Sequence, residues 1–266
     1  MDIKDSRIDA GKAFDWGRTS AEYARFRDIY PGEFYQKIAD LGLCIEGQDV
    51  LDLGTGTGVL PRNMYRFGAR WVGTDISPEQ IEQAKLMSAD AGMNIEYKAV
   101  SAEDIDYPAG SFDVVTACQC FWYFDHKTLM PKLYQLLRKD GRILVLFMAW
   151  LPYEDPVAGA SEEMILKYSP NWTGGRETMH PIHIPDEAFE LFDLIDHDEY
   201  LLDVPFTRES WHGRVFASRG IGASLSGEEL EAWDKEHWAL LEKIAPEEFT
   251  VKHYAAYAVL AKKGEV

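Results

Sequence analysis

The sequence predicts an α/β fold built on a doubly wound, mostly parallel sheet with helices on both faces. Two observations predict it. Short, largely apolar runs recur along the chain and alternate with segments whose apolar residues follow a helical period, which is the pattern of parallel sheets buried on both faces. The length of 266 residues and the hydrophobic content of 46% also suit one large domain with an ordinary buried core.

Five strands are expected in the first 150 residues, and each is followed by a helix or a turn. They cover residues 49–53, 71–75, 94–99, 112–117 and 142–150. Ser77-Pro78 follows the second strand and supplies a helix N-cap with a proline at the first helical position. A helix after Asp125 carries four leucines on one side, so it should pack on the sheet.

The alternation stops after Trp150, and the rest of the chain is expected to complete the sheet and cover it. A proline- and glycine-rich stretch at 151–185 predicts an ordered insertion. The elements expected after it are a helix at 186–195, a strand at 199–205, helices at 207–244 and a strand at 249–261. The two late strands bring the sheet to seven and add an antiparallel edge strand.

The chain is therefore expected to be a single domain over residues 1–266. Its expected parts are a helical arm at 1–45, a cofactor-binding core at 46–150, and helical lid insertions at 151–185 and 207–246.

The charge balance argues against a nucleic-acid partner. The 45 acidic and 27 basic residues give a net charge of −18, whereas proteins that bind nucleic acids present a basic surface to the phosphates. Residues 186–199 alone hold seven carboxylates and no Lys or Arg, and this stretch is interpreted as a solvated acidic face.

The three cysteines and the hydropathy pattern predict a cytoplasmic protein without a membrane partner. The cysteine number is odd and no CxxC spacing occurs, which argues against a disulfide framework. No run of about 18 uncharged apolar residues is present, and the N-terminal residues have no apolar segment of the kind found in secretory signals.

A glycine-rich loop at 52–58 (DLGTGTG) joins the first strand to the first helix. Glycines let backbone N–H groups approach a ligand closely at a helix N-terminus. Asp75 ends the second strand, 17 residues after Gly58, where a carboxylate can accept hydrogen bonds from ribose hydroxyls. Val59 stands where the dinucleotide fingerprint G-x-G-x-x-G has its third glycine, which disfavours a nicotinamide cofactor.

Four segments together resemble the class I S-adenosylmethionine-dependent methyltransferases. They are DLGTGTG at 52–58, GTDIS at 73–77, SAEDIDYPAGSFDVV at 101–115 and CQCFWYFD at 118–125. YARFRDIYP at 23–31 and the helical segment before the last strand are similar to the small-molecule branch of that family, the type 11 and trans-aconitate-like group. The resemblance implies a Rossmann-like methyltransferase fold with S-adenosylmethionine as cofactor.

The resemblance also implies which residues contact the cofactor. Those expected around its methionine moiety are Asp52, Gly54, Thr55, Gly56 and Gly58. Those expected around the ribose and adenine are Asp75, Ile76, Ser101, Ala102 and Glu103. Those expected near the sulfonium and the acceptor are Cys118, Gln119 and Phe121, and Arg27 is expected on the cofactor carboxylate.

The resemblance assigns a specific role to some of these residues and leaves one role open. Asp52 is expected to face the amino group, Asp75 to hold the ribose and Ile76 to pack on the adenine. Ser101 stands where the family often has Asp, so the group that binds the adenine amine is left open.

Two histidines are candidates for a general base. His126 lies in the first turn of a helix after the fourth strand, and His212 lies in a helix of the late insertion. An imidazole can take a proton near neutral pH, although an ordinary solvent-exposed histidine at a helix start is the favoured interpretation for His126, and the balance is similar for His212. His180 and His183 have no second ligand pair, and alternate residues such as Cys118 and Cys120 point apart on a strand, so no metal site is expected.

The function expected from these features is methyl transfer from S-adenosylmethionine to a small molecule, with O, N, C or S as the acceptor atom. The alternatives are a nicotinamide-dependent oxidoreductase, which Val59 disfavours, and a non-catalytic S-adenosylmethionine-binding regulatory protein. A nucleic-acid or protein methyltransferase is disfavoured by the charge and by the absence of an Asn/Asp-Pro-Pro-Tyr motif after the fourth strand. The sequence leaves the oligomeric state open.

Overall fold

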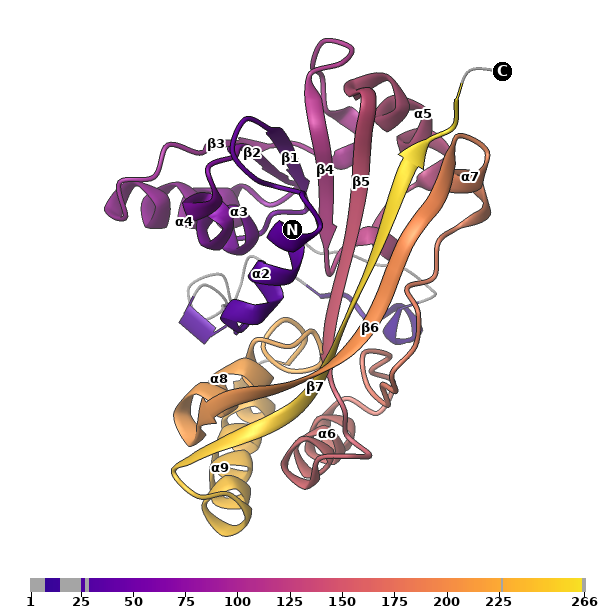
Figure 1. The fold of residues 1–266 in the computed structure, drawn as a ribbon. Coiled ribbons are helices and arrows are strands. Elements are labelled where there is room, and N and C mark those ends of the chain that lie inside the picture. The colour runs from indigo at the N-terminus through magenta and orange to yellow at the C-terminus, as the bar shows by residue number, and fades with distance from the viewer. Residues whose placement is uncertain (1–7, 15–24, 27–28, 226, 265–266) are drawn as a thin grey trace. The chain divides into compact units, whose positions relative to one another are not determined.

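The computed structural model describes residues 8–14, 25–26, 29–225 and 227–264 (Figure 1). The strands in these residues form one seven-stranded sheet in the order β3-β2-β1-β4-β5-β7-β6. They are β1 (Asp49–Leu53), β2 (Arg70–Asp75), β3 (Glu96–Ala99), β4 (Phe112–Cys118), β5 (Leu137–Trp150), β6 (Phe192–Thr207) and β7 (Glu248–Lys262). The pairings from β3 to β5 are parallel, and β7 runs antiparallel to its neighbours (Figure 1).

Helices flank this mixed, mostly parallel sheet, so the predicted fold class is confirmed. They are α2 (Gly32–Asp40), α3 (Val59–Met64), α4 (Pro78–Asp90), α5 (His126–Leu136), α6 (Pro156–Tyr168), α7 (Asp186–Phe189), α8 (Arg208–Phe216) and α9 (Gly227–Ile244). Short 3-10 helices are η1 (Asp9–Gly11), η3 (Tyr65–Phe67), η4 (Ala102–Asp104) and η5 (Phe121–Tyr123). Strand order reverses between β1 and β4, and ligands of open parallel sheets bind at such a switch point.

The chain divides into two compact units, each assembled from three stretches. The core unit comprises Tyr30–Met148, His180–Tyr200 and Ala255–Val266. The helical unit comprises Met1–Ile29, Ala149–Met179 and Leu201–Tyr254. The assignment of all 266 residues to one domain with insertions stays a prediction.

The core unit is held by apolar packing on the sheet. Leu129 and Leu133 of α5 are fully buried in one cluster with residues of β1, β4, β5 and α7, as the leucine pattern predicts. A smaller cluster joins Ile81 and Ala84 of α4 to Tyr97 of β3. The hydroxyl of Ser77 accepts a hydrogen bond from the backbone N–H of Gln80 at 3.3 Å, which confirms the predicted cap of α4.

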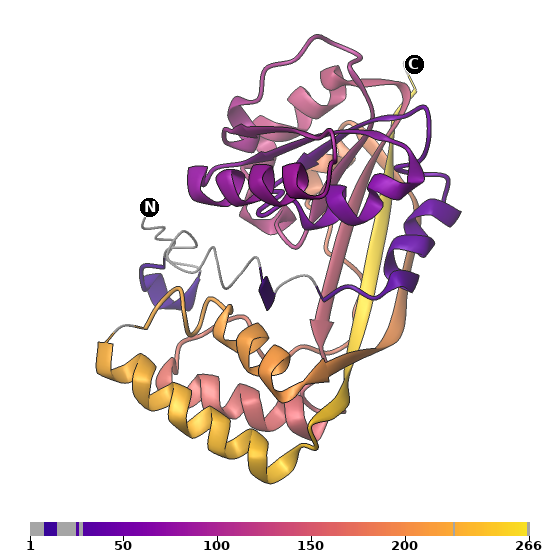
Figure 2. The ribbon, with the colours of Figure 1, turned by 90° about the vertical axis from the view of Figure 1, so that its left-hand side faces the viewer.

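In the helical unit, α6 and α8 each pack against α9 (Figure 2). The indoles of Trp211 on α8 and Trp233 on α9 are fully buried. The Asp155 carboxylate begins α6 by accepting hydrogen bonds from the backbone N–H groups of Val157 and Ala158 at 2.9 and 3.0 Å. An ordered insertion is predicted here, but helix α6 within it is not. No helix among the described residues is long and apolar enough to span a bilayer.

The largest differences from the predicted element boundaries lie at the start of the fifth strand and between residues 186 and 199. The fifth strand begins at Leu137 and not at residue 142. Arg138 is drawn to the sheet because its guanidinium forms ion pairs with Asp49 (2.7 Å) and Asp113. The helix predicted at 186–195 is wrong beyond α7, since β6 already begins at Phe192; this side chain is fully buried in the core-unit cluster.

Candidate active site

The loop after β1 turns through three left-handed glycines. Gly54, Gly56 and Gly58 have φ values of 60°, 56° and 74°, a region that costs other residues roughly 1–2 kcal/mol. Space is also limiting, because a Cβ on Gly58 would lie 2.3 Å from the hydroxyl oxygen of Tyr97. The loop is fastened to β2 by a hydrogen bond from the backbone N–H of Thr55 to the Thr74 carbonyl at 2.8 Å.

Asp75 connects the end of β2 to this loop. One of its carboxylate oxygens accepts the backbone N–H of Gly56 and the other accepts that of Ser77, both at 2.9 Å. A carboxylate oxygen has two lone-pair positions, so each oxygen keeps acceptor capacity that two neighbouring hydroxyls of a sugar could use. Burial raises the pKa of Asp75, while the backbone hydrogen bonds oppose that rise.

Asp52 lies inside β1 beneath the loop. Its side chain is 1% exposed and accepts a hydrogen bond from the Thr116 hydroxyl at 2.6 Å. Burial raises its pKa to about 7, although the Thr116 hydrogen bond lowers it; the negative charge of Asp75 adds to the rise. A cationic group placed next to Asp52 would therefore favour loss of its proton.

The segment predicted to border the adenine forms η4. The Ser101 hydroxyl accepts the backbone N–H of Asp104 at 3.2 Å and donates to the Asp104 carboxylate at 2.8 Å. Ala102 is buried. Glu103 is directed to α5, because its carboxylate accepts the backbone N–H of Asp125 at 2.9 Å. Ile76, the predicted adenine contact, has 53% of its surface exposed.

Gln119 adopts a rare backbone conformation at the exit of β4. Its φ is 66°, an arrangement that costs a non-glycine residue roughly 1–3 kcal/mol and clusters at functional sites. The backbone N–H donates to the Leu146 carbonyl at 2.9 Å, and the side-chain amide donates to the carbonyl of Met148. Both bonds tie this exit to β5. Sequence reasoning placed Gln119 near the site, but nothing in the sequence signals its conformation.

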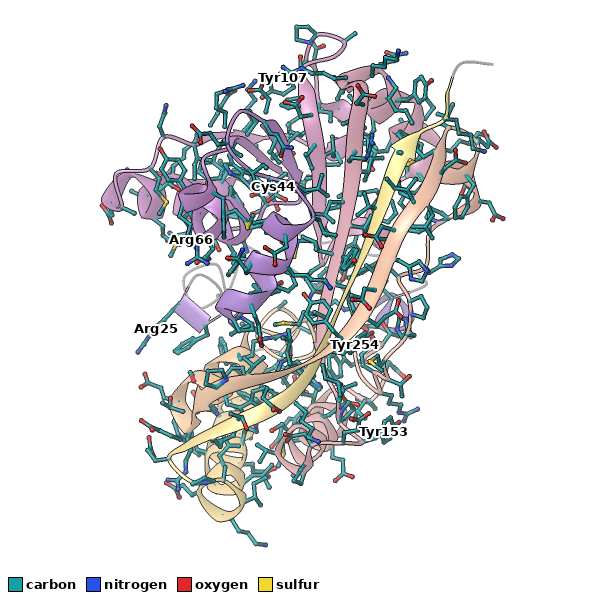
Figure 3. The ribbon with its side chains drawn as sticks, viewed as in Figure 1. Arg25, Cys44, Arg66, Tyr107, Tyr153 and Tyr254 are labelled. Carbon is teal, nitrogen blue, oxygen red and sulfur yellow. The ribbon has the colours of Figure 1, made fainter. Side chains whose placement is uncertain are left out.

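The cysteines on either side of Gln119 face different partners. The Cys118 thiol donates to the Tyr30 hydroxyl at 3.6 Å, and the Cys120 thiol donates to the Leu53 carbonyl at 3.1 Å. The two thiols were predicted to point apart, whereas the contact with Tyr30 was not predicted. Both are free thiols, as is the fully buried Cys44 (Figure 3). Among the described residues, no three His, Cys, Asp or Glu side chains form a cluster able to hold a metal.

The remaining predicted residues are more dispersed. Phe121 is 2% exposed and belongs to the core-unit cluster, and its contact with a cofactor stays a prediction. The ring centroids of His126 and Phe121 are 4.6 Å apart, and burial lowers the pKa of His126. His212 is a buried residue of the helical unit, where its Nε2 lies 3.0 Å from Asp234. Arg27 lies outside the described residues.

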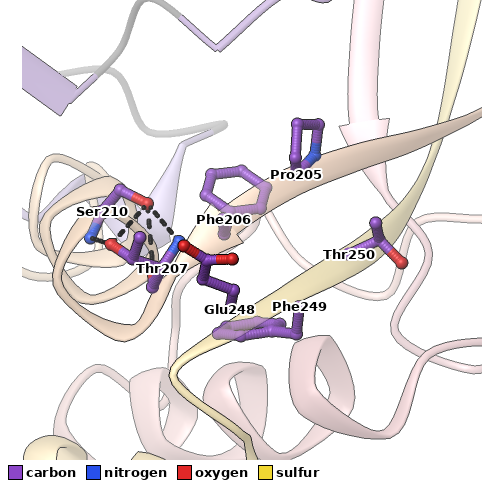
Figure 4. A pocket seen from close by; sticks show the side chains of 7 residues that line it. All are labelled: Pro205, Phe206, Thr207, Ser210, Glu248, Phe249 and Thr250. Carbon is purple, nitrogen blue, oxygen red and sulfur yellow. Dashed lines mark hydrogen bonds between the residues drawn. The ribbon is translucent and has the colours of Figure 1, made fainter.

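A hollow of about 520 Å³ occurs in the helical unit (Figure 4). It is lined by Pro205, Phe206, Thr207, Ser210, Glu248, Phe249 and Thr250. None of these belongs to the glycine loop or to the predicted cofactor contacts, so this hollow is no part of the candidate site.

Comparison with known proteins agrees with this geometry. Residues 51–145 match the family model described as a methyltransferase domain. A ubiquinone biosynthesis O-methyltransferase of Xanthomonas axonopodis is 31% identical over 129 residues, which cover 48% of this chain and 54% of that protein. The chain spans about half the length of the first curated relatives it matches.

Solved structures with the same fold include proteins with different activities. A Haemonchus contortus phosphoethanolamine N-methyltransferase, solved with S-adenosylhomocysteine, has a TM-score of 0.53 at 17% identity, over 92% of this chain and 58% of that one. The [4+2]-cyclase SpnF has a TM-score of 0.52 at 16% identity, over 88% and 81%. Residues 51–145 thus resemble a methyltransferase domain, and the chain is similar in fold to these solved structures.

Proposed function

We propose that this protein transfers the methyl group of S-adenosylmethionine to a small-molecule acceptor. The observation that carries the proposal is the hydrogen bond from the Gly56 N–H to Asp75, because it joins the glycine loop to the carboxylate that we propose binds the ribose. In the reaction the acceptor forms a bond to the methyl carbon as the carbon–sulfur bond breaks. S-adenosylhomocysteine leaves with the electron pair, and the acceptor releases a proton if it carried one.

The residues of the chain would bind and align. Asp75 would accept hydrogen bonds from both ribose hydroxyls, and the N–H groups of the loop would border the methionine moiety. Asp52 would face the amino group, which favours its ionised form. S-adenosylmethionine supplies a strongly electrophilic methyl, so alignment and exclusion of water account for most of the catalysis the protein must provide.

The acceptor is proposed to be a small molecule. The relatives named ubiquinone biosynthesis O-methyltransferases support an oxygen acceptor over the other atoms, and the net charge of −18 argues against a nucleic acid. The three free thiols support a cytoplasmic location as part of the same proposal.

Isothermal titration with S-adenosylhomocysteine tests the cofactor assignment. Asp75→Ala should weaken binding about 100-fold, since it removes two charge-assisted hydrogen bonds worth roughly 1.5 kcal/mol or more each. Asp106→Ala, an exposed carboxylate in the loop after η4, should bind as the parent protein does. Tight binding of NADH, or no binding of S-adenosylhomocysteine, would refute the assignment.

Turnover is tested separately with radiolabelled S-adenosylmethionine and a panel of phenols, amines and carboxylates. Methyl transfer to any of them supports the enzyme. Binding of S-adenosylmethionine without transfer to any panel member would favour the regulatory-protein alternative. Because SpnF shares the fold and is named as a cyclase, the products are identified by mass and not only by cofactor consumption.

A further inference from the structure

A hydrogen-bonded network of polar side chains lies inside the helical unit and joins three helices. The Nδ1 atoms of His212 on α8 and His237 on α9 are 2.9 Å apart. His212 Nε2 lies 3.0 Å from the Asp234 carboxylate, and His237 Nε2 lies 3.1 Å from the Ser161 hydroxyl on α6. The network ends at Trp211, whose indole N–H donates to Ser161 at 2.9 Å. His212 is 7% exposed and His237 fully buried.

The directions of these hydrogen bonds can be assigned from the groups at the two ends of the network. An indole N–H can only donate, so Ser161 accepts from Trp211. We assign the Ser161 hydrogen to His237 Nε2, because this arrangement gives every group of the network a partner. A neutral His237 then carries its hydrogen on Nδ1 and donates to His212 Nδ1. His212 carries its hydrogen on Nε2 and donates to Asp234. Every group is satisfied when both imidazoles are neutral, and the two facing nitrogens share one hydrogen.

An added proton disturbs this arrangement. If the pair holds one more proton, His237 carries a hydrogen on Nε2, which then points at Ser161 together with the N–H of Trp211. The Ser161 hydroxyl loses the acceptor it had. Because the low dielectric of a protein interior makes a mismatched donor costly, the protonated pair fastens the helices less well than the neutral pair.

Few groups near the His212–His237 pair can stabilise the positive charge of an added proton. The rings of Trp233 and Trp238 lie 4.9 and 4.6 Å from that of His212, centroid to centroid. Asp234 is the carboxylate that hydrogen-bonds the pair, and its side chain is 51% exposed. Several other charged side chains of α6, α8 and α9 contact partners outside the pair: Glu162 with Trp150, Lys167 with Glu236, Arg208 with Glu247, Glu209 with Arg25, and Arg214 over the Trp150 ring.

We propose that the His212–His237 pair is an acid-operated latch that holds α8, α9 and, through Ser161, α6 together while both imidazoles are neutral, and loosens them when the pair takes up a proton. The pair is buried between helices whose exposed faces are solvated, so its protonation requires those helices to part at least locally.

The direction of the pH dependence follows from burial. Burial lowers the pKa of His212, opposed by Asp234, and lowers the pKa of His237 to about 3, with His212 adding to the shift. A group whose pKa is depressed on folding favours the unfolded state at low pH. The contribution of the latch is therefore complete above about pH 6.5, the ordinary histidine value, and declines as the pH falls below it.

Hydrogen exchange of the parent protein tests the proposal without any substitution. After correction for the intrinsic pH dependence of exchange, lowering the pH from 7 to 5 should reduce protection of the α8 and α9 amides about tenfold or more, relative to amides of α4. Equal loss of protection in all these elements would overturn the latch.

A variant supplies the second readout. His237→Gln keeps a neutral donor and acceptor between Ser161 and His212, and His180→Gln is the matched control because His180 is exposed. The number of protons taken up on unfolding at pH 5.5, from the pH slope of the unfolding free energy, should fall by about one in His237→Gln and stay unchanged in the control. An unchanged slope in His237→Gln would contradict the proposal, as would an equal fall in the control.

Discussion

At the level of single residues, the buried carboxyl of Asp52 couples the candidate site to pH. Its folded pKa of about 7 lies above the unfolded value near 3.8. A group with a raised folded pKa contributes stability that is present below the unfolded pKa and is lost as the pH rises through the folded one. Ionisation of Asp52 should therefore destabilise the free protein between about pH 4 and pH 7.

Asp52→Asn should remove this contribution. The neutral amide can still accept the hydrogen bond from Thr116, so the variant should gain stability relative to the parent by roughly 1–4 kcal/mol between pH 5 and pH 8. Urea unfolding at several pH values measures the difference. Parallel curves for the two proteins would show that Asp52 stays ionised throughout, and would contradict the raised pKa.

The glycine loop allows a second residue-level prediction. Gly58→Ala combines a left-handed φ with a Cβ that would lie 2.3 Å from the Tyr97 hydroxyl oxygen, and should cost about 2–4 kcal/mol in unfolding free energy. Gly110→Ala is the control, because Gly110 has φ of 68° with no atom within 4 Å of the added Cβ, and should cost only about 1–2 kcal/mol. Equal losses would refute the steric part of the argument.

These residues also show how far the sequence predicts the site. The glycines and Asp75 were identifiable because a left-handed turn and a strand-end carboxylate have local sequence signals. Tyr30 next to Cys118, and the backbone of Gln119, had none, because they depend on how α2, β4 and β5 lie against one another. The Ser101–Asp104 pair in η4 could have been found from the S-x-x-D spacing, which is a capping pattern.

At the level of elements, the first four strands were predicted to within two residues, because short apolar runs between turn residues are distinctive. The predictions were wrong where contacts between residues distant in the sequence determine where an element begins. Arg138 joined β5 because two carboxylates of the sheet bind it. Helix α6 was missed within a proline-rich stretch, although Asp155-Pro156 is itself an N-cap followed by a proline at N1.

Asp155 should therefore contribute more to the free energy of unfolding than an ordinary helix cap does. Besides capping α6, its other carboxylate oxygen accepts the backbone N–H of Lys252 on β7 at 3.0 Å. Asp155→Ala should cost about 3 kcal/mol in urea unfolding, since three hydrogen bonds to a buried carboxylate are lost. Ser77→Ala, which removes the cap of α4, should cost about 1 kcal/mol. Equal costs would mean that the link to β7 contributes nothing.

At the level of the whole molecule, the fold class followed from the sequence but the division into units did not. Alternating strands and helices specify a parallel sheet wherever they occur. Each unit, however, combines three stretches that are far apart in sequence. Asp9 illustrates this, because its carboxylate pairs with Arg219 at 2.7 Å and accepts the backbone N–H of Thr173 at the same distance. No local pattern links residues so distant along the chain.

The net charge of −18 leads to a prediction about the entire protein. Like charges repel one another more in the compact state than in the extended chain, and salt screens this repulsion over a Debye length that falls from about 14 Å at 0.05 M to about 4 Å at 0.5 M. Exposed ion pairs are also screened, but each contributes only about 0–1 kcal/mol. We therefore expect the melting temperature at pH 7 to rise by a few degrees between 0.05 and 0.5 M NaCl.

The same experiment near pH 4.8, the isoelectric point calculated from the sequence, separates repulsion from other effects of salt. The net charge is close to zero there, so the salt-dependent rise should largely vanish, whereas a general effect of salt on apolar burial would persist at both pH values. A melting temperature that falls with salt at pH 7 would show that attractive pairs, such as Arg138 with Asp49, outweigh the repulsion among the 45 acidic residues.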